Sequence, residues 1–272
     1  MPVNADLDDV FAGEGSDAGD GQRAGDPPAD VDDALPVNEL FYSLQGEGTL
    51  AGVPTVFVRT SGCNLRCWFC DSYHTSWEPT HAWMGVDEVV AEVESHERAA
   101  HVVLTGGEPL LHEASVALLD RLGAAGYHTT VETNGTIHRD AHVDLASISP
   151  KLASSTPTAE RDPKGEGEWA ERHETRRIDV DALAALVDDY ESQLKFVVTG
   201  HEDMAEIEAL VERVRAATAA TVPDSAVLLM PEGTTRTELD ETRETVAELA
   251  MEYGYRYTPR LHVDLWNDAP GT

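Results

Sequence analysis

The sequence predicts an α/β fold, an incomplete (β/α)6 barrel of the TIM-like type. Short runs rich in β-branched residues alternate along the chain with segments of helical spacing, which is typical of parallel strands joined by outer helices. The six main strands are too few for the eight-stranded closed barrel. In barrels of this class the reactive groups collect at the carboxyl ends of the strands, so we expect one site at that end.

The predicted elements follow one another along the chain. A first strand is expected at 37–42, before a turn at 43–48. Apolar and β-branched runs predict the main strands at 54–60, 101–104, 127–132, 146–148, 194–199 and 226–230. The spacing of apolar residues predicts helices at 86–97, 114–125, 180–189, 204–217 and 239–253.

Two polar segments lie outside this pattern. Residues 1–36 are acidic and rich in Gly, Ala and Pro, and they have too few apolar groups to offset the entropy lost on ordering. We expect them to form a disordered tail. Residues 153–177 are polar and charged, which is typical of an inserted loop. The range 37–272 is then expected to form a single domain.

The composition is strongly acidic. Lys and Arg total 19 against 51 Asp and Glu, which gives a formal charge of −32. Nucleic-acid affinity depends largely on Lys and Arg contacts with phosphates, so we expect a small-molecule substrate and no direct nucleic-acid partner. The excess charge destabilises the compact state by self-repulsion unless salt screens it. We therefore interpret the sequence as that of a halophilic protein, adapted to a salt-rich cytoplasm.

This interpretation predicts that the melting temperature rises as salt is added. At about 1 M salt the Debye length is only about 3 Å, so most repulsion between exposed carboxylates is screened. A thermal melt across a salt series measures the effect. A melting temperature that does not respond to salt would contradict the interpretation.

The sequence also indicates a compartment. No apolar run approaches the length of a membrane span, and the N-terminus lacks the basic and apolar regions of a signal peptide. All three cysteines cluster in one loop, and an oxidising compartment would threaten their thiols. We expect a cytoplasmic protein.

That loop carries the strongest chemical signal. Cys63, Cys67 and Cys70 have the spacing Cys-x3-Cys-x2-Cys, and thiolates suit zinc or iron–sulfur clusters. Three thiolates do not complete a structural zinc site, which normally has four protein ligands. On a 4Fe-4S cluster they leave one iron free to bind a small molecule. The alternatives are a chance cluster of thiols and a zinc site with His74 as the fourth ligand.

The cysteine loop resembles the signature of the radical S-adenosylmethionine (SAM) superfamily. Over residues 38–266 the chain resembles one family within it, the 7-carboxy-7-deazaguanine synthases. The matching stretches are 43–48, 57–59, the cysteine loop, 105–109, 132–136, 149–151, 195–198, and His262 with Trp266. The cysteine loop alone indicates only the superfamily, whereas the ordered set indicates the synthases.

The resemblance implies two cofactors held by this chain. Cys63, Cys67 and Cys70 would bind the 4Fe-4S cluster, and the fourth iron would bind SAM. The residues implied to contact SAM are Phe69, Asp71, Gly107, Glu108, Glu132, Ser149, Pro150 and Lys151.

The resemblance also implies a substrate site and a magnesium site. Substrate contacts are expected from Leu44, Gln45, Gly46, Arg59 and Thr105. The forked guanidinium of Arg59 suits a carboxylate, although Arg59 could instead pair with one of the chain's many acidic side chains. Ser72 stands where the family usually has threonine, whose hydroxyl helps to hold Mg²⁺. The alternative for Ser72 is an ordinary helix-capping serine.

The implied activity is that of a carbon–nitrogen lyase. It converts 6-carboxy-5,6,7,8-tetrahydropterin to 7-carboxy-7-deazaguanine with loss of ammonia, a step toward the queuosine and archaeosine type of tRNA nucleoside. The implied partners are an electron donor such as flavodoxin or ferredoxin and a second copy of the chain in a homodimer. The alternatives are a glycyl-radical-enzyme activase and a zinc-bound interaction module. A radical enzyme acting on tRNA is disfavoured by the charge.

Overall fold

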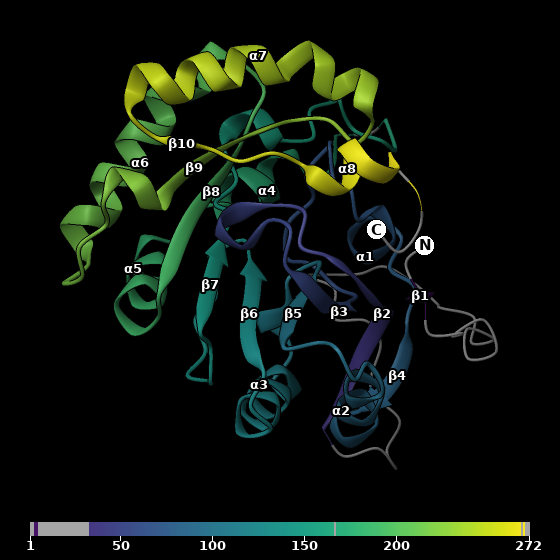
Figure 1. The fold of residues 1–272 in the computed structure, drawn as a ribbon. Coiled ribbons are helices and arrows are strands. Elements are labelled where there is room, and N and C mark those ends of the chain that lie inside the picture. Colours follow the sequence, from purple (N-terminus) through teal and green to yellow (C-terminus); the bar gives the residue numbers. More distant parts are fainter. Residues whose placement is uncertain (1–2, 5–32, 166, 268, 270–272) are drawn as a thin grey trace.

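A ten-stranded sheet forms the frame of the computed structural model, which describes residues 3–4, 33–165, 167–267 and 269. Its central strands run parallel in the order β3 (Pro54–Thr60), β5 (His101–Gly106), β6 (His128–Thr133), β7 (Leu145–Ile148), β8 (Ser192–Val198) and β9 (Val227–Pro231). These are the six main strands predicted from the sequence. The sheet curves without closing, so the incomplete (β/α)6 barrel is confirmed (Figure 1).

Shorter and antiparallel strands extend both edges of the sheet. β2 (Ala34–Leu44) pairs antiparallel with β3, and β1 (Val3–Asn4) and β4 (Ala82–Gly85) pair antiparallel with β2. β10 (Arg256–Tyr257) adds a parallel strand beside β9. Within the tail predicted over 1–36, residues 3–4 and 34–36 therefore lie in strands. Most of that tail, residues 1–2 and 5–32, lies outside the described residues.

Five long helices cover the outer face of the sheet (Figure 1). They are α2 (Val86–Ser95), α3 (Ala114–Ala124), α5 (Val180–Asp189), α6 (Met204–Ala217) and α7 (Arg236–Tyr253). Apolar side chains on the outward side of the strands pack under these helices in two clusters, one beneath α2 and α3 and the other beneath α5, α6 and α7. Among the described residues, no helix is both long enough and apolar enough to cross a membrane.

Short helices lie in the connections, and none of them was predicted. They are α1 (Tyr73–Ser76), α4 (Ala170–Arg176) and α8 (Leu261–Trp266), together with 3-10 turns at η1 (Gly48–Leu50), η2 (Pro109–Leu111), η3 (Ala153–Ser155), η4 (His201–Asp203) and η5 (Asp224–Ala226). Both η3 and α4 fall within the predicted inserted loop, so that segment has local structure.

The inner face of the sheet is polar near its carboxyl end. Strand register aligns Glu39 with Arg59 and Arg59 with Thr105, and it aligns Glu132 with Ser147 and Ser147 with Gln193. We call these six residues the inner polar layer. Side chains alternate across a strand, so the neighbouring residues face the helices. Below the layer, Phe41, Phe57 and Val103 fill the barrel, with the two Phe rings stacked 5.0 Å apart.

Candidate active site

Two glycines at the end of β5, Gly106 and Gly107, hold the cysteine loop in place. Gly107 N donates a 3.0 Å hydrogen bond to Thr60 O, and Glu108 N donates a 2.8 Å bond to Gly62 O. A Cβ atom on Gly107 would lie 2.2 Å from Gly62 O. Gly106 has a φ of 134°, and its Cβ would lie 2.0 Å from Thr60 O. The ends of β3 and β5 therefore approach each other at a distance that only glycine permits.

The three thiols lie in an apolar setting. Cys63 and Cys67 are buried, and Cys70 is half-buried. Burial raises the pKa of the Cys63 thiol to about 12 and raises the pKa values of Cys67 and Cys70 as well. The positive charge of Lys151 acts in the opposite direction and lowers the pKa values of Cys67 and Cys70. The thiolates thus need further positive charge to form.

This donor set fits an iron–sulfur cluster. Three soft sulfurs come from one loop, and cluster iron supplies the positive charge that stabilises thiolates. His74, the fourth ligand of the zinc alternative, has an exposed side chain. Within the described ranges, no three His, Cys, Asp or Glu side chains are arranged to hold a single metal ion.

Several residues predicted to bind SAM lie around the cysteine loop. Lys151 Nζ donates to Ser149 O (2.9 Å) and Ser149 Oγ (2.7 Å), just after β7 and before the inserted segment. Pro150 is buried between them. The half-buried ring of Phe69 packs edge-on against Trp68, with centroids 5.2 Å apart. Their SAM contacts stay predictions, but the fold brings these residues to one edge.

The Glu108 carboxylate faces the protein interior, and its predicted contact with SAM stays a prediction. The side chain is fully buried. Its oxygens accept hydrogen bonds from Asn134 N (2.7 Å), Thr133 Oγ1 (2.9 Å) and Leu110 N (3.1 Å). The carboxylate therefore joins the loop after β5 to the end of β6, because all of its partners belong to those two segments.

Glu108 should make stability depend on pH. Burial raises the pKa of Glu108 to about 7 from the ordinary 4.5, despite its hydrogen bonds. The folded state then holds a proton that the unfolded state has lost, so this contribution falls as the pH rises from about 4.5 to 7. We expect Glu108→Gln to remove about 3 kcal/mol of pH-dependent free energy of unfolding over that window. Urea titrations of both proteins across the window measure it. An equal change of unfolding free energy with pH in the two proteins would contradict the prediction.

The predicted substrate residues meet around Glu132. Gln45 Nε2 donates to Glu132 Oε1 (3.2 Å), and Thr105 Oγ1 donates to Glu132 Oε2 (2.7 Å). Leu44 is half-buried at the end of β2. Glu132, which was predicted to contact SAM, therefore lies with the predicted substrate residues in the inner polar layer.

The turn after β2 is held over the barrel mouth by α8. A Cβ atom on Gly46 would overlap the His262 ring, at 1.9 Å from Nδ1. Leu261 N also donates a 2.8 Å bond to Gly46 O. The glycine at position 46 is thus required by the C-terminal helix, whatever it contacts in a ligand.

Arg59 pairs with an acidic side chain, which is the alternative to carboxylate binding considered for this residue in the sequence analysis. Its Nε lies 2.8 Å from Glu39 Oε2, and its Nη1 donates a 2.8 Å bond to Ser72 Oγ. Ser72 Oγ also lies 3.3 Å from Asp71 Oδ1. The residue predicted to bind the substrate carboxylate and the one predicted to hold magnesium are therefore direct neighbours.

A buried charge network, which we did not predict, crosses the barrel mouth. Lys195 Nζ lies 2.5 Å from Glu47 Oε2 and 3.8 Å from Glu132 Oε1. Arg260 Nε lies 3.1 Å from Glu47 Oε1, and Arg260 Nη2 bonds to Asp71. Lys195 and Glu47 lie in stretches that the family resemblance had marked, so a signal existed for them. For Arg260 the sequence carried none.

Burial opposes ionisation in this network, but the opposite charges outweigh it. Lys195 and Arg260 hold the pKa of Glu47 far below its usual range. Glu47 and Glu132 raise the pKa of Lys195 above its usual range. Glu47 and Lys195 are therefore charged near neutral pH. The network fixes the turn after β2, the inner polar layer and the cysteine loop relative to one another.

The inserted segment packs behind the cysteine loop. Trp68 Nε1 donates to Ser154 O (2.7 Å), and Trp68 N donates to Ser155 O (3.1 Å). Arg66 N donates to His173 Nδ1 (3.2 Å), and the His173 Nε2–H therefore faces Ser155 Oγ at 2.8 Å. Burial lowers the pKa of His173 to about 4, which keeps the ring neutral. The segment is thus part of the scaffold around the cysteines.

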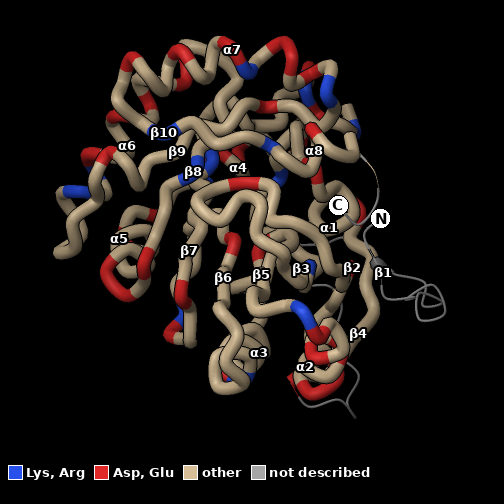
Figure 2. Tube along the Cα trace, viewed as in Figure 1, with Lys and Arg blue, Asp and Glu red and all other residues tan. Residues whose placement is uncertain are grey.

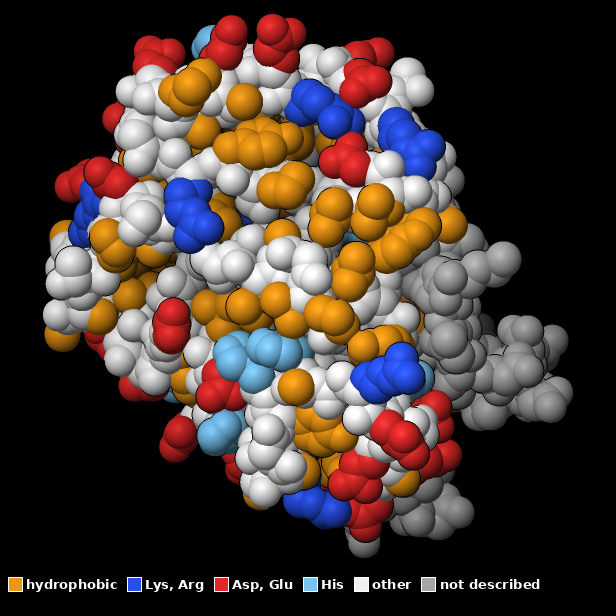
Figure 3. Space-filling model, viewed as in Figure 1, with side chains coloured by type: hydrophobic (Ala, Val, Ile, Leu, Met, Phe, Trp, Pro, Cys, Tyr) orange, Lys and Arg blue, Asp and Glu red, His pale blue; other side chains and the backbone are white. Residues whose placement is uncertain are grey.

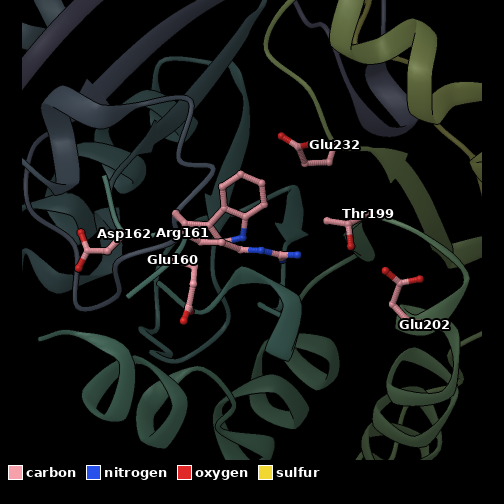
Figure 4. Close-up of a pocket in the computed structure, with 7 residues that line it drawn as sticks. Glu160, Arg161, Asp162, Thr199, Glu202 and Glu232 are labelled. Atoms are coloured by element: carbon pink, nitrogen blue, oxygen red, sulfur yellow. The ribbon is translucent and has the colours of Figure 1, made fainter. Parts of the chain in front are cut away.

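A cavity of about 480 Å³ opens beside the cysteine loop at the carboxyl ends of β8 and β9. Trp68 is among its lining residues. Arg161 lies on one side, and Thr199, Glu202 and Glu232 lie on the other (Figure 4). The Arg161 guanidinium lies 5.3 Å from the centroid of the Trp68 ring. A cavity of this size suits a small molecule.

Comparisons with known proteins decide the family. A model of the radical SAM superfamily matches residues 57–151. A 7-carboxy-7-deazaguanine synthase of Halobacterium salinarum is 72% identical over 250 residues, which cover 92% of this chain and 95% of the relative. The chain belongs to the 7-carboxy-7-deazaguanine synthase family. A synthase of Rhodopirellula baltica, 38% identical over the same shares of each chain, agrees.

The fold agrees with that family. A crystal structure of QueE from Escherichia coli superposes with a TM-score of 0.60 at 24% identity, covering 84% of this chain and 95% of that one. Membership makes this chain a radical SAM enzyme, and the superfamily implies a 4Fe-4S cluster and SAM as cofactors.

Proposed function

We propose that this chain converts 6-carboxy-5,6,7,8-tetrahydropterin to 7-carboxy-7-deazaguanine with loss of ammonia, as a carbon–nitrogen lyase in 7-deazaguanine biosynthesis. Family membership supports the reaction. The observation that carries it is the position of the three-thiol loop directly above the inner polar layer, which offers amide, hydroxyl and guanidinium groups to a polar heterocycle.

Cys63, Cys67 and Cys70 would hold the cluster, and SAM would lie against Phe69, Asp71, Gly107, Glu108, Glu132, Ser149, Pro150 and Lys151. When bound, these cofactors supply an electron and a 5′-deoxyadenosyl radical that removes and returns a hydrogen atom of the substrate. The close glycine contact between the ends of β3 and β5 supports a rigid loop. Its task is to hold both ligands at a fixed distance while apolar walls exclude water.

Leu44, Gln45, Gly46 and Thr105 would orient the pterin, and Arg59 would bind its carboxylate. Arg59 is half-buried, and its guanidinium is already bonded to Glu39 and Ser72. Substrate binding thus requires the substrate carboxylate either to share the Arg59 guanidinium with Glu39 or to displace Glu39 from it. The forked geometry of the guanidinium accepts two carboxylates at once.

We further propose that Ser72 helps to hold Mg²⁺. Its hydroxyl lies beside Asp71 at the barrel mouth, and Mg²⁺ keeps several waters while taking few protein ligands. The Arg59 bond to Ser72 would have to yield to the ion. Serine keeps the hydroxyl of the threonine usual in the family.

The proposed partners are an electron donor of the flavodoxin or ferredoxin type and a second copy of the chain. Acidic residues cover the outer helices, which supports the absence of a direct nucleic-acid partner (Figure 2). Apolar side chains lie exposed along the C-terminal elements (Figure 3), and Met251, Tyr257 and Leu265 are among them. A homodimer would cover such a surface. We place the enzyme in the cytoplasm, where thiols stay reduced.

The test is anaerobic reconstitution at high salt with iron and sulfide, followed by addition of SAM, a reductant, Mg²⁺ and 6-carboxytetrahydropterin. Mass spectrometry should detect 7-carboxy-7-deazaguanine. Cleavage of SAM without this product would refute the substrate and direct attention to a glycyl-radical-enzyme activase. A preparation that holds zinc and no cluster would refute the chemistry as well.

A further inference from the structure

We propose that Ser76 is a positioning residue that raises the reduction potential of the cluster through a hydrogen bond to the Cys70 sulfur. Ser76 is the last residue of α1, and its Oγ donates to Cys70 Sγ at 3.1 Å. The serine is buried, with 2% of its surface exposed. The inference rests on the proposed function only in requiring that the three cysteines bind a 4Fe-4S cluster.

Each cysteine sulfur has a hydrogen-bonding neighbour. Leu65 N donates to Cys63 Sγ at 3.4 Å, Ser155 bonds to Cys67, and Ser76 together with the backbone of Ser72 bonds to Cys70. The Ser155 hydroxyl is shared with Leu152 O and the His173 ring. Within the described residues, the Ser76 hydroxyl has the Cys70 sulfur as its one hydrogen-bond partner. Ser76 is therefore the donor whose removal can be interpreted most directly.

The position of Ser76 is fixed from both sides. Gly62 N, at the start of the cysteine loop, donates a 2.8 Å bond to Thr75 O. Trp77 Nε1 donates a 2.9 Å bond to Cys67 O in the middle of the loop. The residues before and after Ser76 thus attach α1 to the loop, which holds the backbone of Ser76 beside Cys70.

The direction of the effect follows from charge. Reduction adds one electron to the cluster, from the 2+ to the 1+ state, and moves no proton in this scheme. The added negative charge is shared with the cysteine sulfurs, and a donor aimed at a sulfur stabilises the reduced state more than the oxidised one. Removal of the Ser76 hydroxyl should therefore make reduction harder.

The test is a potentiometric titration with dithionite, followed by electron paramagnetic resonance, on reconstituted protein without SAM. For Ser76→Ala we expect the equilibrium to shift about tenfold toward the oxidised cluster, which is about 59 mV for a one-electron couple. Ser76→Thr keeps the hydroxyl and should restore the wild-type potential. Thr75→Val is the matched control, because the neighbouring Thr75 Oγ1 donates to Ser72 O and touches no sulfur.

The iron and sulfide content of each protein distinguishes a failure to bind the cluster from a failure of the predicted shift in potential. A wild-type protein that takes up no cluster would overturn both this inference and the proposed function. A fully loaded Ser76→Ala with the wild-type potential would overturn the inference alone, as would an equal shift in Thr75→Val. If Ser76→Ala cannot be loaded, Ser76→Gly also lacks the hydroxyl and must show the same shift.

Discussion

Cys67→Ala is expected to lose all cluster iron and all SAM cleavage while it keeps its fold. The chain has three cysteines, so no other thiol can replace the missing ligand. Cys67 is buried, and its backbone carbonyl is held by Trp77 Nε1, a bond that alanine preserves. Removing one sulfur from a packed site leaves a small cavity worth about 1 kcal/mol. Iron and sulfide analysis, SAM cleavage and a thermal melt measure the three quantities.

His74→Ala is the control for this prediction. His74 follows the cysteines closely in sequence, but its side chain is exposed, so its removal should leave iron content and SAM cleavage unchanged. Iron retained by Cys67→Ala would remove Cys67 from the ligand set. Loss of bound metal from His74→Ala would return attention to the zinc alternative.

The fold was predictable where apolar periodicity was strong. α5 and α6 have the predicted ends, and β3 matches its prediction, because a long amphipathic or β-branched run defines each of them. α7 begins at Arg236, earlier than predicted, because its start depends on the capping box of Thr235 and Glu238 and not on apolar spacing. β4 and β10 are too short to show any periodicity.

The site was predictable where it is local in sequence. The cysteine loop and the glycines at the end of β5 each lie within a few residues, so their chemistry can be read directly. The contact between Arg260 and Glu47 joins residues 213 positions apart, and no local pattern reveals it. The hydrogen bonds of Glu108 could not be predicted for a related reason. Its motif indicated a loop near SAM, whereas the direction of its side chain depends on Thr133 and Asn134 from the next strand.

Lys195→Met should destabilise the protein by about 3–5 kcal/mol at neutral pH, which is typical when one partner of a buried ion pair is removed. The side chains of Lys195 and Glu47 are only 6% and 13% exposed. The variant leaves Glu47 with Arg260 as its remaining cationic contact, at 3.1 Å, and leaves Glu132 without its lysine. Urea unfolding at constant high salt measures the loss.

The dependence of this stability loss on pH, together with a matched control variant, identifies the cause of the loss. The lowered pKa of Glu47 means that its stabilising charge is fully present above the ordinary value of 4.5 and is lost as the pH falls. The difference between wild type and variant should thus shrink below about pH 4.5. Lys164→Met removes a lysine whose pair with Glu78, at 3.6 Å, is exposed, and it should change stability by less than about 1 kcal/mol.

A double variant separates the ion pair from simple packing. Lys195→Met combined with Glu47→Gln removes both charges, so it should lose less stability than the sum of the single losses. Additive losses would show that Lys195 and Glu47 stabilise the barrel independently of each other. A sub-additive result would mean that the paired charges hold the turn after β2 against the inner polar layer. In that case the geometry of the proposed pterin site depends on a contact between the turn after β2 and strand β8, which lie near opposite edges of the sheet.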